Sequence, residues 1–128
     1  MNILLDTHVA LWAITDSPRL GAQSRAMIED PDALIWVSAA SLWEIAIKHA
    51  PGRGDMPIAA QEALDYFQAS GFSMLPVSAR HAVAVESLPL HHHDPFDRIL
   101  IAQAFTEPMT LITHDAQILL YGNIFVAA

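Results

Sequence analysis

The sequence predicts an α/β protein, a three-layer α/β/α sandwich around a central, mostly parallel sheet of four to five strands. Short apolar runs typical of buried strands alternate along the chain with longer segments whose apolar residues recur at helical spacing. Hydrophobic residues make up 53% of the 128 residues, as expected where helices cover both faces of a parallel sheet. Because no repeat or interdomain linker is evident, we expect one domain over residues 1–128.

The first half of the chain predicts two strands and three helices, with Pro and Asp residues as the breakers between them. In order these are a strand at 2–5, a short helix at 9–12, a helix at 20–28, a strand at 33–37 and a helix from a Ser38 cap to about His49. The Pro/Gly segment at 51–57 is the clearest loop, and it is too short to join two domains.

The second half continues the alternation. The expected elements are a helix at 58–70, a strand at 72–77, a helix from Ser78 to about Glu86, a helix from Asp94 to Glu107, a strand at 109–113, a short helix at 116–120 and a strand at 124–126. Gly71 is a typical helix stop. Asp94 is a good N-cap and Pro95 suits the first helical position, so the helix after them has the best-marked start in the chain.

Three acids fall where parallel strands end or where a helix begins. Asp6 follows the first strand, Asp115 follows the strand at 109–113, and Asp97 opens the helix before that strand. In open α/β sheets, sites form beyond the carboxyl ends of the strands. If the first strand and the strand at 109–113 are neighbours, these three acids converge.

Glu44 joins this set through the pattern of its helix. Ser41, Glu44 and Lys48 share one face of the otherwise apolar helix at 38–49, which looks buried on nearly all sides. A polar stripe on a buried helix must meet water, ions or a partner. The alternative is a plain Glu44–Lys48 ion pair on a solvated face.

Each acid also has a simpler interpretation: Asp6 and Asp115 as N-caps, Asp97 as a first-turn acid and Glu44 as an ion-pair member. Together, four converging carboxylates repel one another strongly unless a cation binds between them. Oxygen ligands select hard cations, so we expect Mg²⁺, for which Mn²⁺ can substitute. A cation held in this way suits hydrolysis of phosphodiester bonds.

The chain resembles the PIN-domain ribonucleases, specifically the VapC-type toxins of toxin–antitoxin pairs. The matching segments are Leu4-Leu5-Asp6-Thr7-His8, Ser38 to Lys48, His93-Asp94-Pro95-Phe96-Asp97-Arg98 and Thr113-His114-Asp115. The resemblance implies an endoribonuclease of the tRNA- or rRNA-cleaving class that inhibits translation, with a central first strand and a metal held by Asp6, Glu44, Asp97 and Asp115. It further implies that Asp94 is an additional acid and that Thr7 and Thr113 support the site.

The resemblance also implies partners. These are a homodimer and a cognate VapB-type antitoxin, whose tail lies across a hydrophobic groove and adds an Arg or Lys to the acidic pocket. Such apolar surfaces have four aromatic candidates, each of which is individually also explained by an ordinary core: Trp12, Trp36, Trp43 and Phe105.

Basic residues are few, with six Lys or Arg and a net charge of −8. Lys48 and Arg98 lie nearest the acids in sequence, as candidates for phosphate contact or ion pairs, and Arg53 is a candidate for RNA contact from the loop. His8 and His114 flank predicted metal acids, where an imidazole can move a proton. For the run His91 to His93 we favour packing or capping, because adjacent loop residues rarely point at one ion.

The composition also bears on cellular location and on the alternative functions. The chain has no cysteine, no apolar run long enough for a membrane span and no basic N-terminal leader, so we expect a cytoplasmic location and no membrane partner. A non-catalytic RNA- or partner-binding module on the same scaffold remains an alternative. A phosphatase or phosphorelay domain fits poorly, since His8 stands where a haloacid-dehalogenase-type enzyme has a second Asp.

Overall fold

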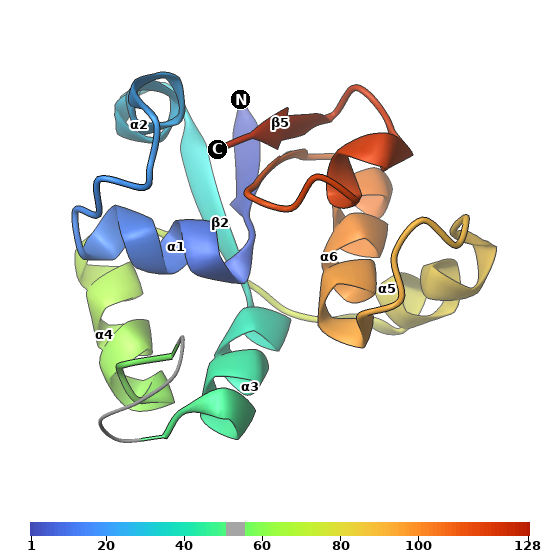
Figure 1. The fold of residues 1–128 in the computed structure, drawn as a ribbon, viewed down its shortest axis with the longest axis horizontal. Coiled ribbons are helices and arrows are strands. Elements are labelled where there is room, and N and C mark those ends of the chain that lie inside the picture. The colour runs from blue at the N-terminus through green and yellow to red at the C-terminus, as the bar shows by residue number, and fades with distance from the viewer. Residues whose placement is uncertain (51–55) are drawn as a thin grey trace.

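The predicted α/β/α sandwich is confirmed in a computed structural model, which describes residues 1–50 and 56–128 (Figure 1). One five-stranded sheet has the order β3-β2-β1-β4-β5, and every neighbouring pair is parallel. The strands are β1 (Asn2–Leu5), β2 (Leu34–Ser38), β3 (Ser73–Leu75), β4 (Thr110–Thr113) and β5 (Phe125–Ala127). The helices are α1 (Thr7–Ile14), α2 (Ala22–Glu29), α3 (Ala39–Lys48), α4 (Ala60–Ala69), α5 (Ala79–Ala84) and α6 (Pro95–Thr106), with 3-10 turns η1 (Val85–Ser87) and η2 (Ile118–Tyr121). No helix in these two ranges is long and apolar enough to cross a membrane.

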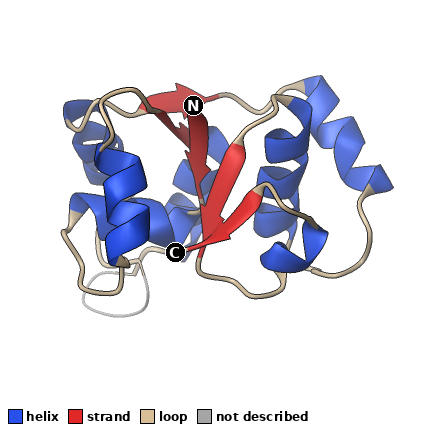
Figure 2. Ribbon diagram, turned by 90° about the horizontal axis from the view of Figure 1, so that it is seen from above, coloured by secondary structure: helices blue, strands red, loops and turns tan. Residues whose placement is uncertain are grey.

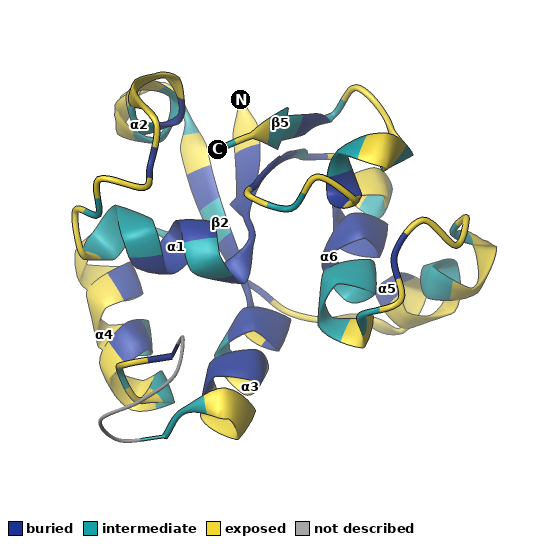
Figure 3. Cartoon of the chain, viewed as in Figure 1, coloured by how far each residue is buried: buried dark blue, intermediate teal, exposed yellow. Residues whose placement is uncertain are grey.

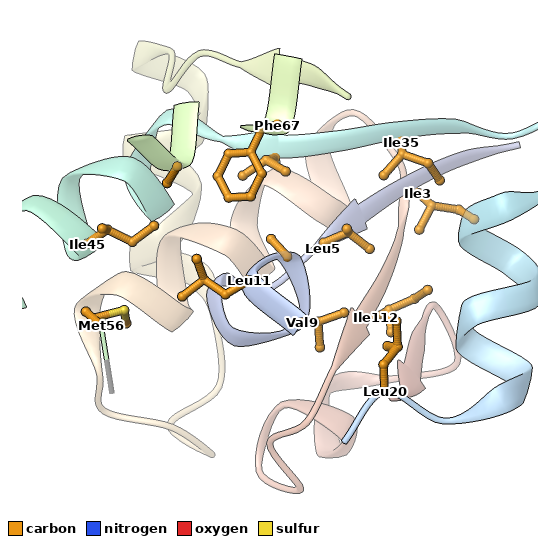
Figure 4. Packing of buried hydrophobic residues seen from close by; sticks show 13 residues of the cluster. Ile3, Leu5, Val9, Leu11, Leu20, Ile35, Ile45, Met56, Phe67 and Ile112 are labelled. Atoms are coloured by element: carbon orange, nitrogen blue, oxygen red, sulfur yellow. The ribbon is translucent and has the colours of Figure 1, made fainter. Parts of the chain in front are cut away.

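Helices lie on either side of the sheet, as Figure 2 shows from above. The central strand β1 is buried from Ile3 to Leu5. Ile3 and Leu5 face one core, which α1 and α4 complete with residues such as Val9 and Phe67 (Figure 4). Leu4 faces the opposite core, under α6 and η2. The continuous apolar run of the first strand is therefore explained by two cores rather than one.

Element boundaries differ from the expected ones where local hydrogen bonding intervenes. α1 begins at Thr7, because Asp6 caps it. β3 has three residues instead of six, since Pro76 has no N–H to continue the ladder. The expected helix at 116–120 is the 3-10 turn η2, which follows a turn in which Asp115 accepts the N–H of Gln117 at 2.8 Å.

The expectation that the helix at 38–49 is buried on nearly all sides is wrong. α3 has both buried and exposed turns (Figure 3). Its apolar Trp43 and Ile47 are 63% and 58% exposed, whereas the polar Ser41 and Glu44 are 1% and 4% exposed. α3 packs against α1, α4 and α6. Ser41 and Glu44 of the polar stripe therefore face the interior of the protein together with Ile45, whereas Trp43 and Ile47 lie at the surface.

Candidate metal centre

The predicted acids lie at the carboxyl edge of the sheet. β1 pairs with β4 in parallel, with Leu5 opposite Ile112, so Asp6 and the segment after Thr113 leave the sheet side by side. The N-terminus of α6 comes to the same edge, below β1 in Figure 1, and α3 lies beside it. The condition set by the sequence, that these two strands be neighbours, is met.

Asp6 is almost completely buried and fully hydrogen bonded. Its Oδ1 accepts the N–H of Val9 at 2.8 Å and so caps α1. Its Oδ2 accepts the hydroxyl of Thr113 at 2.6 Å and the N–H of His114 at 3.1 Å. The N-cap interpretation of Asp6 is therefore correct, and the same carboxylate also joins the end of β1 to the end of β4.

His114 extends the Asp6 network towards solvent. Its Nδ1 lies 3.1 Å from Asp6 Oδ2, and its side chain is 41% exposed. This hydrogen bond raises the pKa of His114, and the charges of Asp6 and Asp115 add to the increase. His8 reaches the network only through its ring, which packs edge-on against His114 with centroids 4.8 Å apart.

Glu44 is buried between a hydroxyl and an ammonium group. The Thr7 hydroxyl donates to Glu44 Oε1 at 2.7 Å, and the Nζ of Lys48 lies 2.7 Å from Oε2. This contact raises the pKa of Lys48, and the charges of Asp94 and Asp97 act in the same direction. The i,i+4 pair of the simpler interpretation therefore exists, but its carboxylate faces the acids instead of solvent.

The closest convergence involves His92, which belongs to the histidine run for which the sequence favoured packing or capping. His92 Nε2 donates to Asp115 Oδ2 at 2.7 Å and lies 3.0 Å from Asp97 Oδ2. Among the described residues, this trio is the one group whose potential metal ligands all lie within 4.8 Å of one another. Asp6 and Glu44 are not part of this trio; both are buried, and each is held by its own hydrogen bonds.

The backbone at the start of α6 fixes the tautomer of His92. The N–H of Asp94 donates to His92 Nδ1 at 3.1 Å, so Nδ1 carries no proton and Nε2 carries the one that faces the acids. His92 thus accepts a backbone N–H near the helix start, in line with the predicted packing or capping role, but its contact with Asp97 and Asp115 was not predicted. The available signal was the spacing His-x-Asp, which places an imidazole beside the free amides of a capped helix.

The pKa values of Asp97 and Asp115 are shifted in opposite directions. Desolvation, together with the charge of Asp94, raises the pKa of Asp97 to about 7. Burial also acts to raise the pKa of Asp115, but hydrogen bonds from His92 and the Gln117 N–H outweigh it, so this pKa is lowered. Asp97 is therefore the acid that gains most from a nearby cation.

The remaining predicted residues separate into two groups. Asp94 is the N-cap of α6, with Oδ1 accepting the N–H groups of Phe96 at 2.8 Å and Asp97 at 3.4 Å. Arg98, a candidate for phosphate contact or for an ion pair among the acids, instead donates to the backbone carbonyls of Val85, Leu88, Pro89 and His92. Arg53 lies outside the described residues.

The donor set at this edge fits a hard divalent cation. The sequence has no cysteine, and the imidazole nitrogen within the trio presents a proton instead of a lone pair. What remains are carboxylate oxygens, the ligands that Mg²⁺ and Mn²⁺ prefer. The partial protonation of Asp97 near neutral pH is the expected state of such a cluster when no cation is bound.

Three comparisons with known proteins agree with one another. A family model described as "PIN domain" matches residues 3–122. Ribonuclease VapC22 of Mycobacterium tuberculosis (strain ATCC 25618 / H37Rv) is 31% identical over 122 residues, which cover 91% of this chain and 89% of that protein. In structure, VapBC2 from Rickettsia felis bound to a DNA fragment from its promoter aligns with a TM-score of 0.71 at 18% identity, covering 100% of this chain and 98% of that one. DNA-bound VapBC from Salmonella typhimurium aligns with a TM-score of 0.65 at 14% identity, covering 100% and 97%. At these identities the structural likeness concerns the fold alone.

Proposed function

This chain belongs to the PIN-domain family, among its VapC-type ribonucleases, and from that premise we propose that it is a Mg²⁺-dependent endoribonuclease, the toxin of a toxin–antitoxin pair. The observation that supports this most directly is the pair Asp97 and Asp115, brought to one edge of the sheet beside the buried Asp6 and Glu44. The proposed substrate is structured cellular RNA of the tRNA or rRNA class, whose cleavage would inhibit translation.

In this proposal, four carboxylates hold the cation: Asp6, Glu44, Asp97 and Asp115. When bound, Mg²⁺ or Mn²⁺ supplies an activated water and polarises a phosphoryl oxygen. Thr113 and Thr7 orient Asp6 and Glu44 through their hydroxyls. Such outer contacts fix ligand geometry and strengthen metal binding.

Two cationic groups of the site are open to solvent and can meet a phosphate. Lys48 is paired with Glu44 but has a side chain that is 44% exposed. His114, with its raised pKa, is positioned to move a proton or contact an RNA oxygen. Since the chain carries a net charge of −8, bulk attraction for nucleic acid is weak, and recognition would depend on RNA shape.

Cleavage of a structured RNA by the purified chain tests this proposal. We expect cleavage with Mg²⁺ or Mn²⁺, loss of cleavage with EDTA and recovery when the metal is returned in excess. Cleavage that persists in EDTA would contradict the proposal. RNA binding without cleavage under all these conditions would favour the alternative, a non-catalytic RNA- or partner-binding module on the same scaffold.

We also propose that the partner is a VapB-type antitoxin and that its apolar segment occupies a groove of about 470 Å³ beside the acids. The lining residues are Ala40, Trp43, Val77, Ala82, Val85, Pro95, Phe96 and Ile99. Trp43 packs edge-on against Phe96 with centroids 5.2 Å apart, and Lys48 Nζ lies 5.4 Å from the same Phe96 ring. The groove therefore leads from the exposed apolar face of α3 towards the acids.

Of the four aromatic candidates for partner surfaces, Trp43 fits this role best. Trp36 packs against a core and donates its Nε1–H to Asn2, and Trp12 packs against His114. Phe105 is 45% exposed but lies against Phe125. The homodimer stays a prediction of the family resemblance.

A charge placed in this groove should separate antitoxin binding from RNA cleavage. Ala82→Glu puts a carboxylate on the groove wall, which is expected to weaken the complex with the antitoxin at least tenfold, since burying an unpaired charge is costly. RNA cleavage should be unchanged. The matched control is Val83→Glu, one residue along α5 and 70% exposed outside the groove. Equal antitoxin affinity for the two variants, measured by titration calorimetry, would place the antitoxin elsewhere.

A further inference from the structure

We propose that His92 is a positioning residue for the metal centre, holding Asp97 and Asp115 together through its Nε2–H without itself binding the metal. This inference rests on the proposed metal site and adds a residue to its machinery. His92 is 8% exposed, and its Nε2 lies 2.7 Å from Asp115 Oδ2 and 3.0 Å from Asp97 Oδ2. An imidazole so placed between two acids either orients them, competes with the cation for them, or joins them as a ligand.

The direction of the hydrogen bonds argues against a ligand role. Because the Asp94 N–H donates to Nδ1, that nitrogen is an acceptor and the N–H of the ring is on Nε2. Binding of a metal by Nε2 would require that proton to leave and Nδ1 to take one, which would set two donors against each other at 3.1 Å. His92 is therefore built to donate towards the acids.

The backbone of His92 is held on both sides, which keeps the ring in this position. Its N–H donates to the Tyr121 hydroxyl at 3.0 Å, and its carbonyl accepts from Arg98 Nη1 at 3.1 Å. Tyr121 in turn donates to the Pro89 carbonyl at 2.6 Å. Arg98, whose guanidinium donates to four backbone carbonyls, thus supports the loop that carries His92.

The use of the carboxylate oxygens favours orientation over competition. His92 faces one oxygen of each acid, Oδ2 in both cases. Among the described residues no hydrogen bond reaches Asp97 Oδ1, and Asp115 Oδ1 accepts only the Gln117 N–H. Each acid therefore keeps an oxygen with lone pairs for a cation. One N–H group that faces Oδ2 of both acids therefore draws them together and leaves Oδ1 of each to a cation.

Two substitutions separate the two ring nitrogens. His92→Gln places an amide near the position of Nε2 and keeps a donor to the acids, whereas His92→Asn places its amide near Nδ1 and keeps only a partner for the Asp94 N–H. In the full chain at fixed pH, Mn²⁺ affinity measured by electron paramagnetic resonance should fall about 10- to 100-fold in His92→Asn and stay within about threefold of wild type in His92→Gln. Wild-type affinity in His92→Asn would overturn the proposal, and tighter binding would show competition instead.

A measurement on the unmodified chain covers the case in which a variant does not fold. In a ¹⁵N-histidine NMR spectrum, His92 should show the Nε2–H tautomer without Mg²⁺ and keep it when Mg²⁺ is added. Conversion to the Nδ1–H tautomer would make His92 a ligand and refute the positioning role. Asp97→Asn in the same Mn²⁺ titration separates the two hypotheses: if it binds like wild type, the proposed metal site itself fails. If Asp97→Asn loses Mn²⁺ affinity and His92→Asn does not, the metal site is supported and the proposed role of His92 is wrong.

Discussion

Asp97→Asn is expected to abolish metal-dependent RNA cleavage, by well over a hundredfold, while the protein remains folded. Loss of a residue that merely orients a metal ligand typically costs 10- to 100-fold, and this substitution removes the charge of a proposed ligand itself. The fold should tolerate it, because the Asp97 carboxylate accepts no hydrogen bond from the described residues apart from its contact with His92. Cleavage of a labelled RNA, with unfolding followed by circular dichroism, measures both effects.

Asp94→Ala is the matched control, one turn earlier on the same helix. Asp94 holds the first turn of α6 through two backbone N–H groups, so its loss should cost about 1 kcal/mol of stability and little activity. If Asp94→Ala were inactive and Asp97→Asn active, the two roles would be reversed. Asp6→Asn is less informative, since an amide in place of Oδ2 would face the Thr113 and His114 donors and destabilise the sheet edge.

Metal affinity should fall steeply below neutral pH. The pKa of Asp97 is raised to about 7 in the metal-free protein, so a cation must displace a proton there at lower pH. Apparent affinity for Mn²⁺ should therefore drop about tenfold per pH unit below 7, or roughly a hundredfold between pH 8 and pH 5. The raised pKa of His114 acts in the same direction, because its positive charge opposes a cation near Asp6.

Asp94→Ala again supplies the control for this pH dependence. Because the charge of Asp94 helps to raise the pKa of Asp97, its removal should move the midpoint of the Mn²⁺ affinity curve to lower pH. Titrations of both proteins between pH 5 and pH 8 would show the displacement. An affinity that is flat across this range in the wild-type chain would rule out Asp97 as a ligand that must lose a proton.

The raised pKa of Asp97 also determines how the stability of the metal-free protein changes with pH. The pKa of Asp97 is higher folded, about 7, than the 3.8 of an ordinary aspartate, so the folded state binds more protons between these values. Its contribution is therefore lost as pH rises from about 4 to about 7. His114, with a pKa raised above 6.5, also loses its contribution as pH rises, whereas the lowered pKa of Asp115 matters only near pH 4 and below. Without metal, the melting temperature should be lower at pH 8 than at pH 5.

Local patterns were enough to predict α6 and the sheet, because their determinants lie within each segment. Asp94 and Pro95 define the start of α6 by themselves, and the apolar run of β1 identifies a strand with two covered faces. The outward side of α3 could not be predicted in this way. Its orientation depends on Thr7, which is 37 residues away and gives Glu44 a buried partner.

The roles of His92 and Arg98 were beyond sequence reasoning for a related reason. The sequence shows the charge and size of a histidine in a loop or of an arginine after an acid, but it does not show which atoms these side chains contact. His92 forms a hydrogen bond with Asp115, 23 residues later in the chain. Arg98 donates to backbone carbonyls as far as 13 residues earlier. Both outcomes are set by the path of the loop between η1 and α6, which depends on how the whole chain packs.

The bond between Thr113 and Asp6 joins residues 107 positions apart, and this has a consequence for the order of events during synthesis. Asp6 is made at the start, but its neighbour in the sheet and the last acid, Asp115, are among the final residues of these 128 to be made. A growing chain that ends before β4 lacks Asp115, the last of the four acids, and the strand that pairs with β1 on the side of the sheet where Asp6 and Asp115 meet. The four acids of the proposed metal site would thus come together only after the ribosome has translated nearly all of this sequence.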